Sequence, residues 1–250
     1  MDRFFKVFSK ICAVLFVLSF AVLTGFIAIV IPASSNSFYV ERFREVDKDG
    51  KTAHDYVQEQ TYFLLDDETA RFVMDMTEED LVYIMKHVVR YCFYLEEDLN
   101  PTINGYKMQF FREDEIAHMK DVKNLFGAGL IIVGVCLVVF IATLCLAIIK
   151  RKSYYQNCRK IPFYVLLGVF IVVLAVGIFA VLNFDKAFDI FHQILFSGNW
   201  EFEDGIMIKM IGYIFDDILP IILTLWLSLL ALLGVGVWLY NKKLKTKQTK

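Results

Sequence analysis

Four long stretches without a charged residue constrain what this chain can fold into. They are Ile11 to Ala33, Leu125 to Ile149, Ile161 to Leu182 and Ile218 to Tyr240. Each provides the roughly 20 apolar residues that an α-helix needs to cross about 30 Å of hydrocarbon. The sequence therefore predicts an all-α integral membrane protein, built as a four-transmembrane-helix bundle with an extracytoplasmic cap.

The first stretch follows Arg3, Lys6 and Lys10, as the core of a signal peptide would. Its apolar run is longer than the roughly 7 to 15 residues of such a core, and no small-residue cleavage site follows it. We interpret it as a membrane anchor.

The short connections predict the orientation. The linker from Lys150 to Lys160 and the tail from Asn241 to Lys250 are rich in Lys and contain no Asp or Glu. The positive-inside rule assigns such segments to the cytoplasm. We therefore expect both termini in the cytoplasm and a multi-pass membrane protein, with residues 34–124 and 183–217 on the extracytoplasmic side.

This topology divides the chain into eight segments. In order, they are a cytoplasmic N-terminus with the first span (1–33), a cap segment (34–124), the second span (125–149), a basic loop (150–160), the third span (161–182), a second extracytoplasmic segment (183–217), the fourth span (218–240) and a basic tail (241–250).

The extracytoplasmic segments carry weaker local signals. Thr77 to Asp80 resembles a capping box, which opens a predicted amphipathic helix. Its apolar face comprises Leu81, Ile84, Met85, Val88, Cys92 and Leu95.

Aromatic and charged residues around Asp49-Gly50 suggest a short hairpin. Residues 184–195 place Phe184, Phe188, Phe191 and Leu195 on one helical face, and residues 206–215 are predicted to lie in the membrane interface.

Several function classes are disfavoured. The net charge of −2 and the lack of a phosphate-binding glycine motif argue against nucleic acid and nucleotides. The four spans contain no ionisable side chain, which argues against coupled transport. A single extracytoplasmic cysteine, Cys92, cannot form an internal disulfide, and no Gly-x-Ser-x-Gly elbow indicates a serine nucleophile.

Histidines are the best candidates for chemistry, because they titrate near neutral pH. His118 precedes the second span, and Glu115 and Asp121 flank it at i−3 and i+3 if that helix begins early. His192 follows the third span, with Asp189 at i−3. The topology puts both histidines on the outer side, so we expect a catalytic pair with three supporting carboxylates.

Other interpretations of these residues remain open. Each histidine alone is compatible with a polar residue at the membrane interface, and His54 and His87 lack comparable neighbours. Zinc is a rival use of His118, Asp121 and His192, although no His-Glu-x-x-His spacing builds a site locally. Asn199-Trp200 is interpreted as an interfacial anchor.

At these histidines the chain resembles the bacterial lipoprotein intramolecular transacylases (Lit), multi-pass membrane proteins of Gram-positive bacteria. The resemblance rests on Glu115-Ile116-Ala117-His118-Met119-Lys120-Asp121-Val122-Lys123-Asn124-Leu125-Phe126, on Phe191-His192-Gln193-Ile194-Leu195-Phe196, and on the order of the four spans. It covers nearly the whole length. The chain departs from the family pattern at residues 197–205, which lack the family's two prolines.

The resemblance implies that the substrate is a diacylated bacterial lipoprotein within the membrane phospholipid. The family moves the sn-2 acyl chain of the S-diacylglyceryl-cysteine onto its own α-amine, which gives a lyso-form lipoprotein. The catalytic role of the family's histidines carries over to His118 and His192, and neither a cofactor nor a metal is expected. The rivals are a metal-dependent lipid or ester hydrolase and a non-catalytic lipid-binding scaffold.

Overall fold

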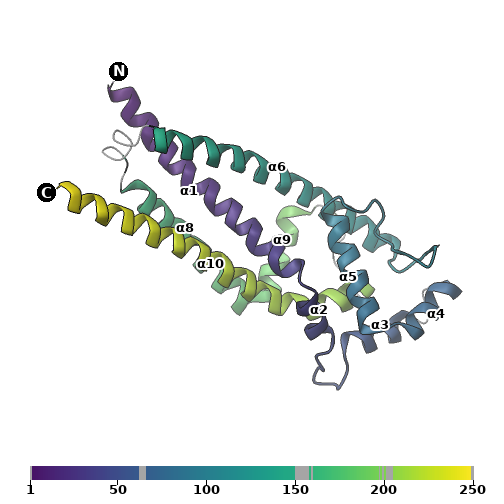
Figure 1. Ribbon diagram of the computed structural model, residues 1–250. Helices are drawn as coiled ribbons and strands as arrows, with labels where there is room; N and C mark the ends of the chain where they lie inside the picture. The colour runs from purple at the N-terminus through teal and green to yellow at the C-terminus, as the bar shows by residue number, and fades with distance from the viewer. Residues whose placement is uncertain are drawn as a thin grey trace. The chain divides into compact units, whose positions relative to one another are not determined.

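The computed structural model describes residues 2–61, 66–149, 158, 160–196, 198, 200 and 205–248 (Figure 1). Four helices in this part of the chain are long and apolar enough to cross a membrane. They are α1 (Asp2–Ala33), α6 (Glu113–Ile149), α8 (Ile161–Leu182) and α10 (Ile206–Gln248). The predicted helical membrane architecture is confirmed. The uncharged part of α6 begins at Leu125, so its first turns lie outside the span.

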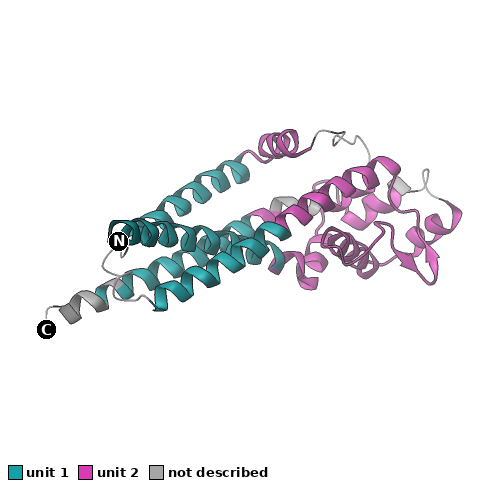
Figure 2. Cartoon of the chain, turned by 90° about the horizontal axis from the view of Figure 1, so that it is seen from above, with its two compact units in different colours: residues 1–30, 130–182, 220–250 teal, residues 31–129, 183–219 magenta. Residues whose placement is uncertain are grey.

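The chain divides into two compact units, coloured separately in Figure 2. The first, the membrane unit, comprises residues 1–30, 130–182 and 220–250. The second, the cap unit, comprises residues 31–129 and 183–219. The side chains of both candidate catalytic histidines belong to the cap unit.

In the membrane unit a small apolar core joins three helices. Val17 and Ala21 of α1 pack with Leu166 of α8 and Leu230 of α10. Trp226 donates its indole N–H to the carbonyl of Ala21 over 3.0 Å. Most apolar side chains of the spans are left exposed by this packing, which is the surface that a lipid-facing helix needs.

The cap unit has its own hydrophobic core. The short helix α2 (Asn36–Phe43) packs against the longer α5 (Glu78–Cys92), and α3 (Ala53–Thr61) packs against α4 (Asp67–Asp75). The largest buried side chains of this core include Tyr39, Phe43, Leu81, Ile84 and Phe110. Tyr39 also donates its hydroxyl to the carbonyl of Ala33, at the C-terminus of α1.

The predicted capping box of α5 is present, with Thr77 and Asp80 each accepting the other's backbone N–H. Leu81, Ile84, Met85, Val88 and Cys92 are buried as expected. Leu95 was predicted on the same face, but it lies beyond the end of the helix and is 61% exposed. The helix ends at Cys92, and Tyr94 has a positive φ of 61° that a helix cannot continue.

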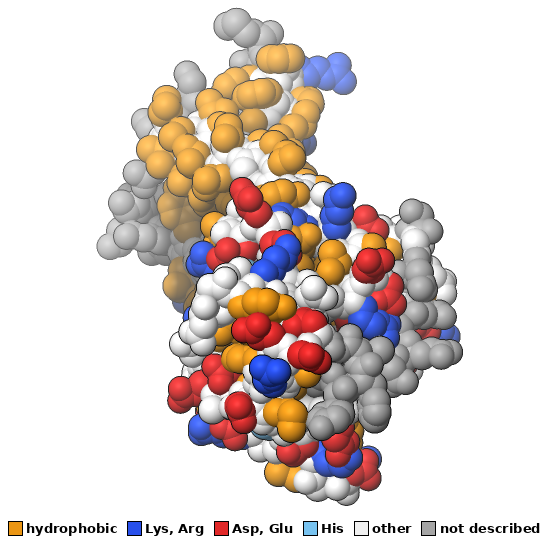
Figure 3. Space-filling view, turned by 90° about the vertical axis from the view of Figure 1, so that its right-hand side faces the viewer, with side chains coloured by type: hydrophobic (Ala, Val, Ile, Leu, Met, Phe, Trp, Pro, Cys, Tyr) orange, Lys and Arg blue, Asp and Glu red, His pale blue; other side chains and the backbone are white. Residues whose placement is uncertain are grey.

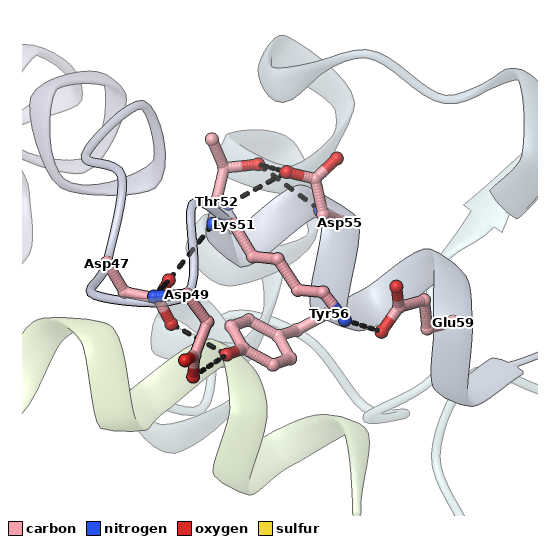
Figure 4. A network of polar contacts seen from close by, with 7 residues as sticks. All are labelled: Asp47, Asp49, Lys51, Thr52, Asp55, Tyr56 and Glu59. Atoms are coloured by element: carbon pink, nitrogen blue, oxygen red, sulfur yellow. Dashed lines mark hydrogen bonds and ion pairs between the residues drawn. The ribbon is translucent and has the colours of Figure 1, made fainter.

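The predicted hairpin around Asp49-Gly50 is wrong, because the flanking segments form the helices α2 and α3. The turn itself is present: Asp47 accepts the N–H groups of Asp49 and Lys51, and Gly50 has a φ of 77° (Figure 4). The described part of the cap instead contains one hairpin, between β1 (Thr102–Ile103) and β2 (Tyr106–Lys107). That hairpin turns through Asn104-Gly105, both with positive φ.

Residues 206–215 do not form the separate interfacial segment that we predicted. They are the first turns of α10, which continues without interruption into the fourth apolar stretch. Ile206, Met207, Met210 and Ile214 are buried in the core of the cap unit.

Charged and hydrophobic side chains are segregated on the face drawn in Figure 3. Charged side chains gather in the lower part of this view, and hydrophobic side chains gather in the upper part.

Candidate catalytic site

His118 is carried by the second turn of α6. This helix begins at Glu113, three turns before the apolar stretch, as the sequence predicts. Three acidic residues occupy its first turn, where the helix dipole favours negative charge: Glu113, Asp114 and Glu115. His118 is therefore attached to the membrane span by continuous helix, and it lies about two turns before the apolar stretch begins.

Glu115 joins the beginnings of two helices. Its side chain is fully buried, and its two carboxylate oxygens accept the N–H of Arg112 over 2.9 Å and the N–H of Met207 over 2.8 Å. The first amide lies just before α6 and the second lies in the first turn of α10, where amides lack helical partners. Burial raises the pKa of Glu115, whereas the hydrogen bonds from the amides of Arg112 and Met207 lower it. Glu115 therefore fixes the first turn of α6 against that of α10.

This connection leaves no room for a side chain at Gly205. A Cβ atom added there would lie 2.3 Å from a carboxylate oxygen of Glu115. The close approach explains why the residue before α10 is a glycine, since any other residue would displace the carboxylate.

His192 is carried by α9 (Phe184–Leu195), one turn from its end. Its Nδ1 lies 2.8 Å from the carbonyl oxygen of Phe188. A carbonyl can only accept, so Nδ1 carries the proton and donates it. In the neutral ring, Nε2 then holds the lone pair. The hydrogen bond within α9 thus selects the tautomer in which Nε2 can accept a proton.

The two histidines meet within the cap unit. Their ring centroids lie 5.8 Å apart, and the ring planes are inclined by 26°. His192 is almost completely buried, at 7% exposed, whereas His118 is partly exposed. The structure therefore brings together the two residues that the sequence analysis proposed as a pair, from helices separated by more than 70 positions in the chain.

Aromatic rings enclose the pair. The ring centroid of Phe188 lies 3.9 Å from the centroid of the His192 ring, and the ring centroid of Trp200 lies 5.0 Å from the same ring. Phe196 lies 5.0 Å from His118 and 5.4 Å from His192. These ring contacts help to hold the two imidazoles in place.

The environment keeps His118 neutral near pH 7. Burial lowers the pKa of His118, the neighbouring His192 lowers it further, and the charge of Asp121 partly opposes both effects. A neutral imidazole has one nitrogen that can accept a proton and one that can donate a hydrogen bond. Neutral His118 can therefore take part in acid–base chemistry.

The three supporting carboxylates lie in different settings. Asp121 is exposed on α6, and its charge acts on His118 as described above. Asp189 is exposed on α9, and the Nδ1 of His192 has the carbonyl of Phe188 as its partner. Glu115 is directed at backbone amides. Its support for His118 is therefore positional, through the first turn of α6.

The sequence analysis did not find Trp200 as a site residue. It interpreted Asn199-Trp200 as an interfacial anchor, whereas the indole packs against His192. Asn199 and residues 201–204 lie outside the described residues. No helical periodicity could have identified Trp200, because it lies beyond the end of α9.

The other candidate groups lie in structural positions. The Nε2 of His54 forms a hydrogen bond with the carbonyl of Met76, and the Nε2 of His87 forms one with the carbonyl of Asp98. Burial raises the pKa of Cys92 to about 12, so this thiol is not a ready nucleophile. Within the described ranges, no three His, Cys, Asp or Glu side chains cluster in a way that would hold a metal ion.

Comparisons with known proteins identify the family. Residues 9–215 match the family described as lipoprotein intramolecular transacylase Lit. A search of curated proteins gave no match. The chain resembles the solved structure of the membrane-integral Lit from Bacillus cereus, with a TM-score of 0.62, 16% identity, and coverage of 97% of this chain and 99% of that one. A histidine-to-arginine variant of the same protein gives a TM-score of 0.61 at 16% identity, covering 99% and 97%.

The family match extends over most of the chain and includes both histidines, and the fold similarity extends over nearly all of it. The chain therefore belongs to the lipoprotein intramolecular transacylase family, Lit.

Proposed function

We propose that this protein moves the sn-2 acyl chain of an S-diacylglyceryl-cysteine onto the α-amine of the same lipoprotein. The substrate is a diacylated lipoprotein in the bacterial cell membrane, and the product is the lyso form. One observation carries the proposal: two imidazoles from α6 and α9 face each other at 5.8 Å, and one of them has its tautomer fixed by a backbone carbonyl.

The reaction needs two proton movements. The amine nitrogen attacks the ester carbonyl and loses a proton, and the glyceryl oxygen gains one as the carbon–oxygen bond breaks. The tautomer of His192 favours it as the base, because its Nε2 then holds the lone pair. This nitrogen takes the proton from the amine and returns it to the glyceryl oxygen as the carbon–oxygen bond breaks. His118, neutral through its lowered pKa, donates an N–H to the developing oxyanion. Positioned acid–base groups of this kind contribute about 10² to 10⁴ in rate.

The remaining acceleration comes from the substrate itself. Amine and ester belong to one lipid-modified cysteine, so the attack is intramolecular and requires no soluble acyl donor. No cofactor enters this scheme. The topology that we propose has both termini in the cytoplasm and residues 34–124 and 183–217 outside, where mature lipoproteins carry their lipid. The basic linker at 150–160 and the basic tail support this orientation.

Mass spectrometry of a reporter lipoprotein tests the proposal. A host that makes only the diacyl form would express the native protein, His118→Ala, His192→Ala or the control His87→Ala. We expect the N-acyl, S-monoacylglyceryl peptide with the native protein and the control, and its loss by at least 100-fold in the two site variants.

Three results would contradict parts of this proposal. Persistence of the diacyl form despite verified membrane expression would overturn transacylation and leave a scaffold role. Release of free fatty acid, inhibited by a chelator and restored by zinc, would indicate a metal-dependent hydrolase. Full activity of either histidine variant would overturn the assignment of the pair.

A further inference from the structure

The helix that carries His192 has an apolar side that the protein does not cover. Four of its apolar residues are between 41% and 74% exposed: Ile190, Phe191, Ile194 and Leu195. Ile194 is the most exposed, at 74%. Four adjacent side chains of this size form an apolar patch that a soluble surface rarely leaves open.

The polar residues of α9 gather on another side of the helix. Asp185, Lys186, Asp189 and Gln193 are all exposed. At 100° per residue they cover one contiguous arc, and Ile194 lies directly opposite Asp185. The helix is thus divided lengthwise into an apolar and a charged side, as helices lying in a membrane interface are.

Chain connectivity indicates what covers the apolar side. The uncharged α8 ends at Leu182, and α9 begins two residues later at Phe184. Consecutive Cα atoms are about 3.8 Å apart, so α9 starts within roughly 8 Å of the end of a membrane span. With 12 residues it is about 18 Å long, which is too short to cross the bilayer.

We propose that α9 lies in the outer interface of the bilayer, with Ile190, Phe191, Ile194 and Leu195 inserted among the phospholipid acyl chains. The occupant of this surface is membrane lipid. His192 lies between the apolar and the polar arcs of α9, which places its ring near the level of the glycerol ester groups. Resting on the proposed transacylation, this means that the lipoprotein reaches His118 and His192 sideways, without its acyl chains leaving the membrane.

Depth-dependent quenching tests the insertion independently of activity. Single cysteines are introduced by Ile194→Cys and Asp185→Cys in a chain whose five native cysteines are replaced, and each is labelled with NBD in phospholipid nanodiscs. We expect brominated lipids to quench the label at position 194 at least threefold more than at 185, and aqueous iodide to show the reverse order. Equal quenching of both labels by iodide would overturn the insertion.

A matched pair of variants tests the consequence for the reaction. Ile194→Glu places a charge on the apolar arc, whereas Gln193→Glu places the same charge on the polar arc. We expect Ile194→Glu to reduce lyso-form production at least tenfold in membranes, and Gln193→Glu to change it less than twofold. Equal rates in the two variants would overturn the sideways route. Lipid quenching at 194 in a protein that makes no lyso form would leave the insertion standing and reject the transacylase proposal alone.

Discussion

The Nδ1 of His192 donates to the carbonyl oxygen of Phe188, one helical turn earlier, over 2.8 Å. The acceptor is a backbone carbonyl of the same helix, so the bond needs no contribution from another segment. It fixes the tautomer in which Nε2 is the proton acceptor. Which nitrogen of the His192 ring carries the proton is therefore determined by its own helix.

We predict that this tautomer is observable. In ¹⁵N-histidine-labelled protein above pH 7, the resonance pair that is lost in His192→Gln should have a protonated Nδ1 and an unprotonated Nε2. The chain has four histidines, so assignment by substitution is practical. A protonated Nε2 in the neutral ring would contradict the assignment of His192 as the base.

The pH dependence should report the lowered pKa of His118. Because the folded pKa lies below the unfolded value of about 6.5, the unfolded chain binds more protons between the two values. Stability therefore falls as the pH drops below about 6.5, until the folded pKa is passed. Denaturant unfolding in detergent at a series of pH values between about 5 and 7 measures this loss, and constant stability would contradict the lowered pKa of His118.

Asp121→Asn tests the charge interaction between Asp121 and His118. Asp121 raises the pKa of His118, so its neutralisation should lower the folded pKa further and extend the loss of stability to lower pH. Asp185→Asn, an equivalent change at an exposed position of α9, should leave the pH dependence of stability as in the native protein. The same pH dependence of stability for Asp121→Asn and the native protein would contradict this interaction.

Glu115→Gln should destabilise the cap. A glutamine side chain has one carbonyl oxygen, so it can accept from only one of the amides of Arg112 and Met207. The other amide stays buried without a partner, at a cost of roughly 2 kcal/mol. Glu113→Gln, at an exposed position of the same turn, is the matched control. Thermal unfolding in detergent should show a lower Tm for Glu115→Gln alone, and equal values would contradict the two-helix connection.

Trp200→Ala should reduce lyso-form production because it removes a ring that packs on His192. Aromatic pairs contribute about 0.5 to 1.5 kcal/mol, which corresponds to at most roughly a tenfold change in rate. Trp200→Phe should retain most of the activity, and Trp238→Ala in the membrane unit should retain all of it. Rates can be compared by quantitative mass spectrometry of the reporter peptide. Equal activity of Trp200→Ala and Trp238→Ala would remove Trp200 from the site.

Local signals in the sequence were sufficient for a large part of this architecture. The four spans follow from length and the absence of charge, and the capping box of α5 follows from Thr77 and Asp80, which lie within one turn. The early start of α6 followed from an uninterrupted helical pattern around His118. Each of these features depends on residues that are close together in the chain.

Features that depend on distant contacts were missed. Met207, the partner of Glu115, is 92 positions away, and no local pattern connects the two. Residues 206–215 were separated from the fourth span because Asp216 and Asp217 interrupt the apolar run, but a charge does not end a helix whose apolar side packs in a core. The segment around Asp49 was predicted as a hairpin because its aromatic and charged residues resemble an exposed strand pair. Packing of α2 against α5 and of α3 against α4 instead stabilises helices there.

The close approach of Gly205 to Glu115 also limits how this sequence can diverge. A methyl group at position 205 would collide with the carboxylate, and a shorter side chain at position 115 would leave the amide of Met207 without an acceptor. Each change alone is harmful, but a shorter acid at 115 also removes the collision, so a small side chain at 205 then adds little further cost. The two positions are therefore epistatic, and mutational scans should find that substitutions tolerated at one depend on the residue at the other.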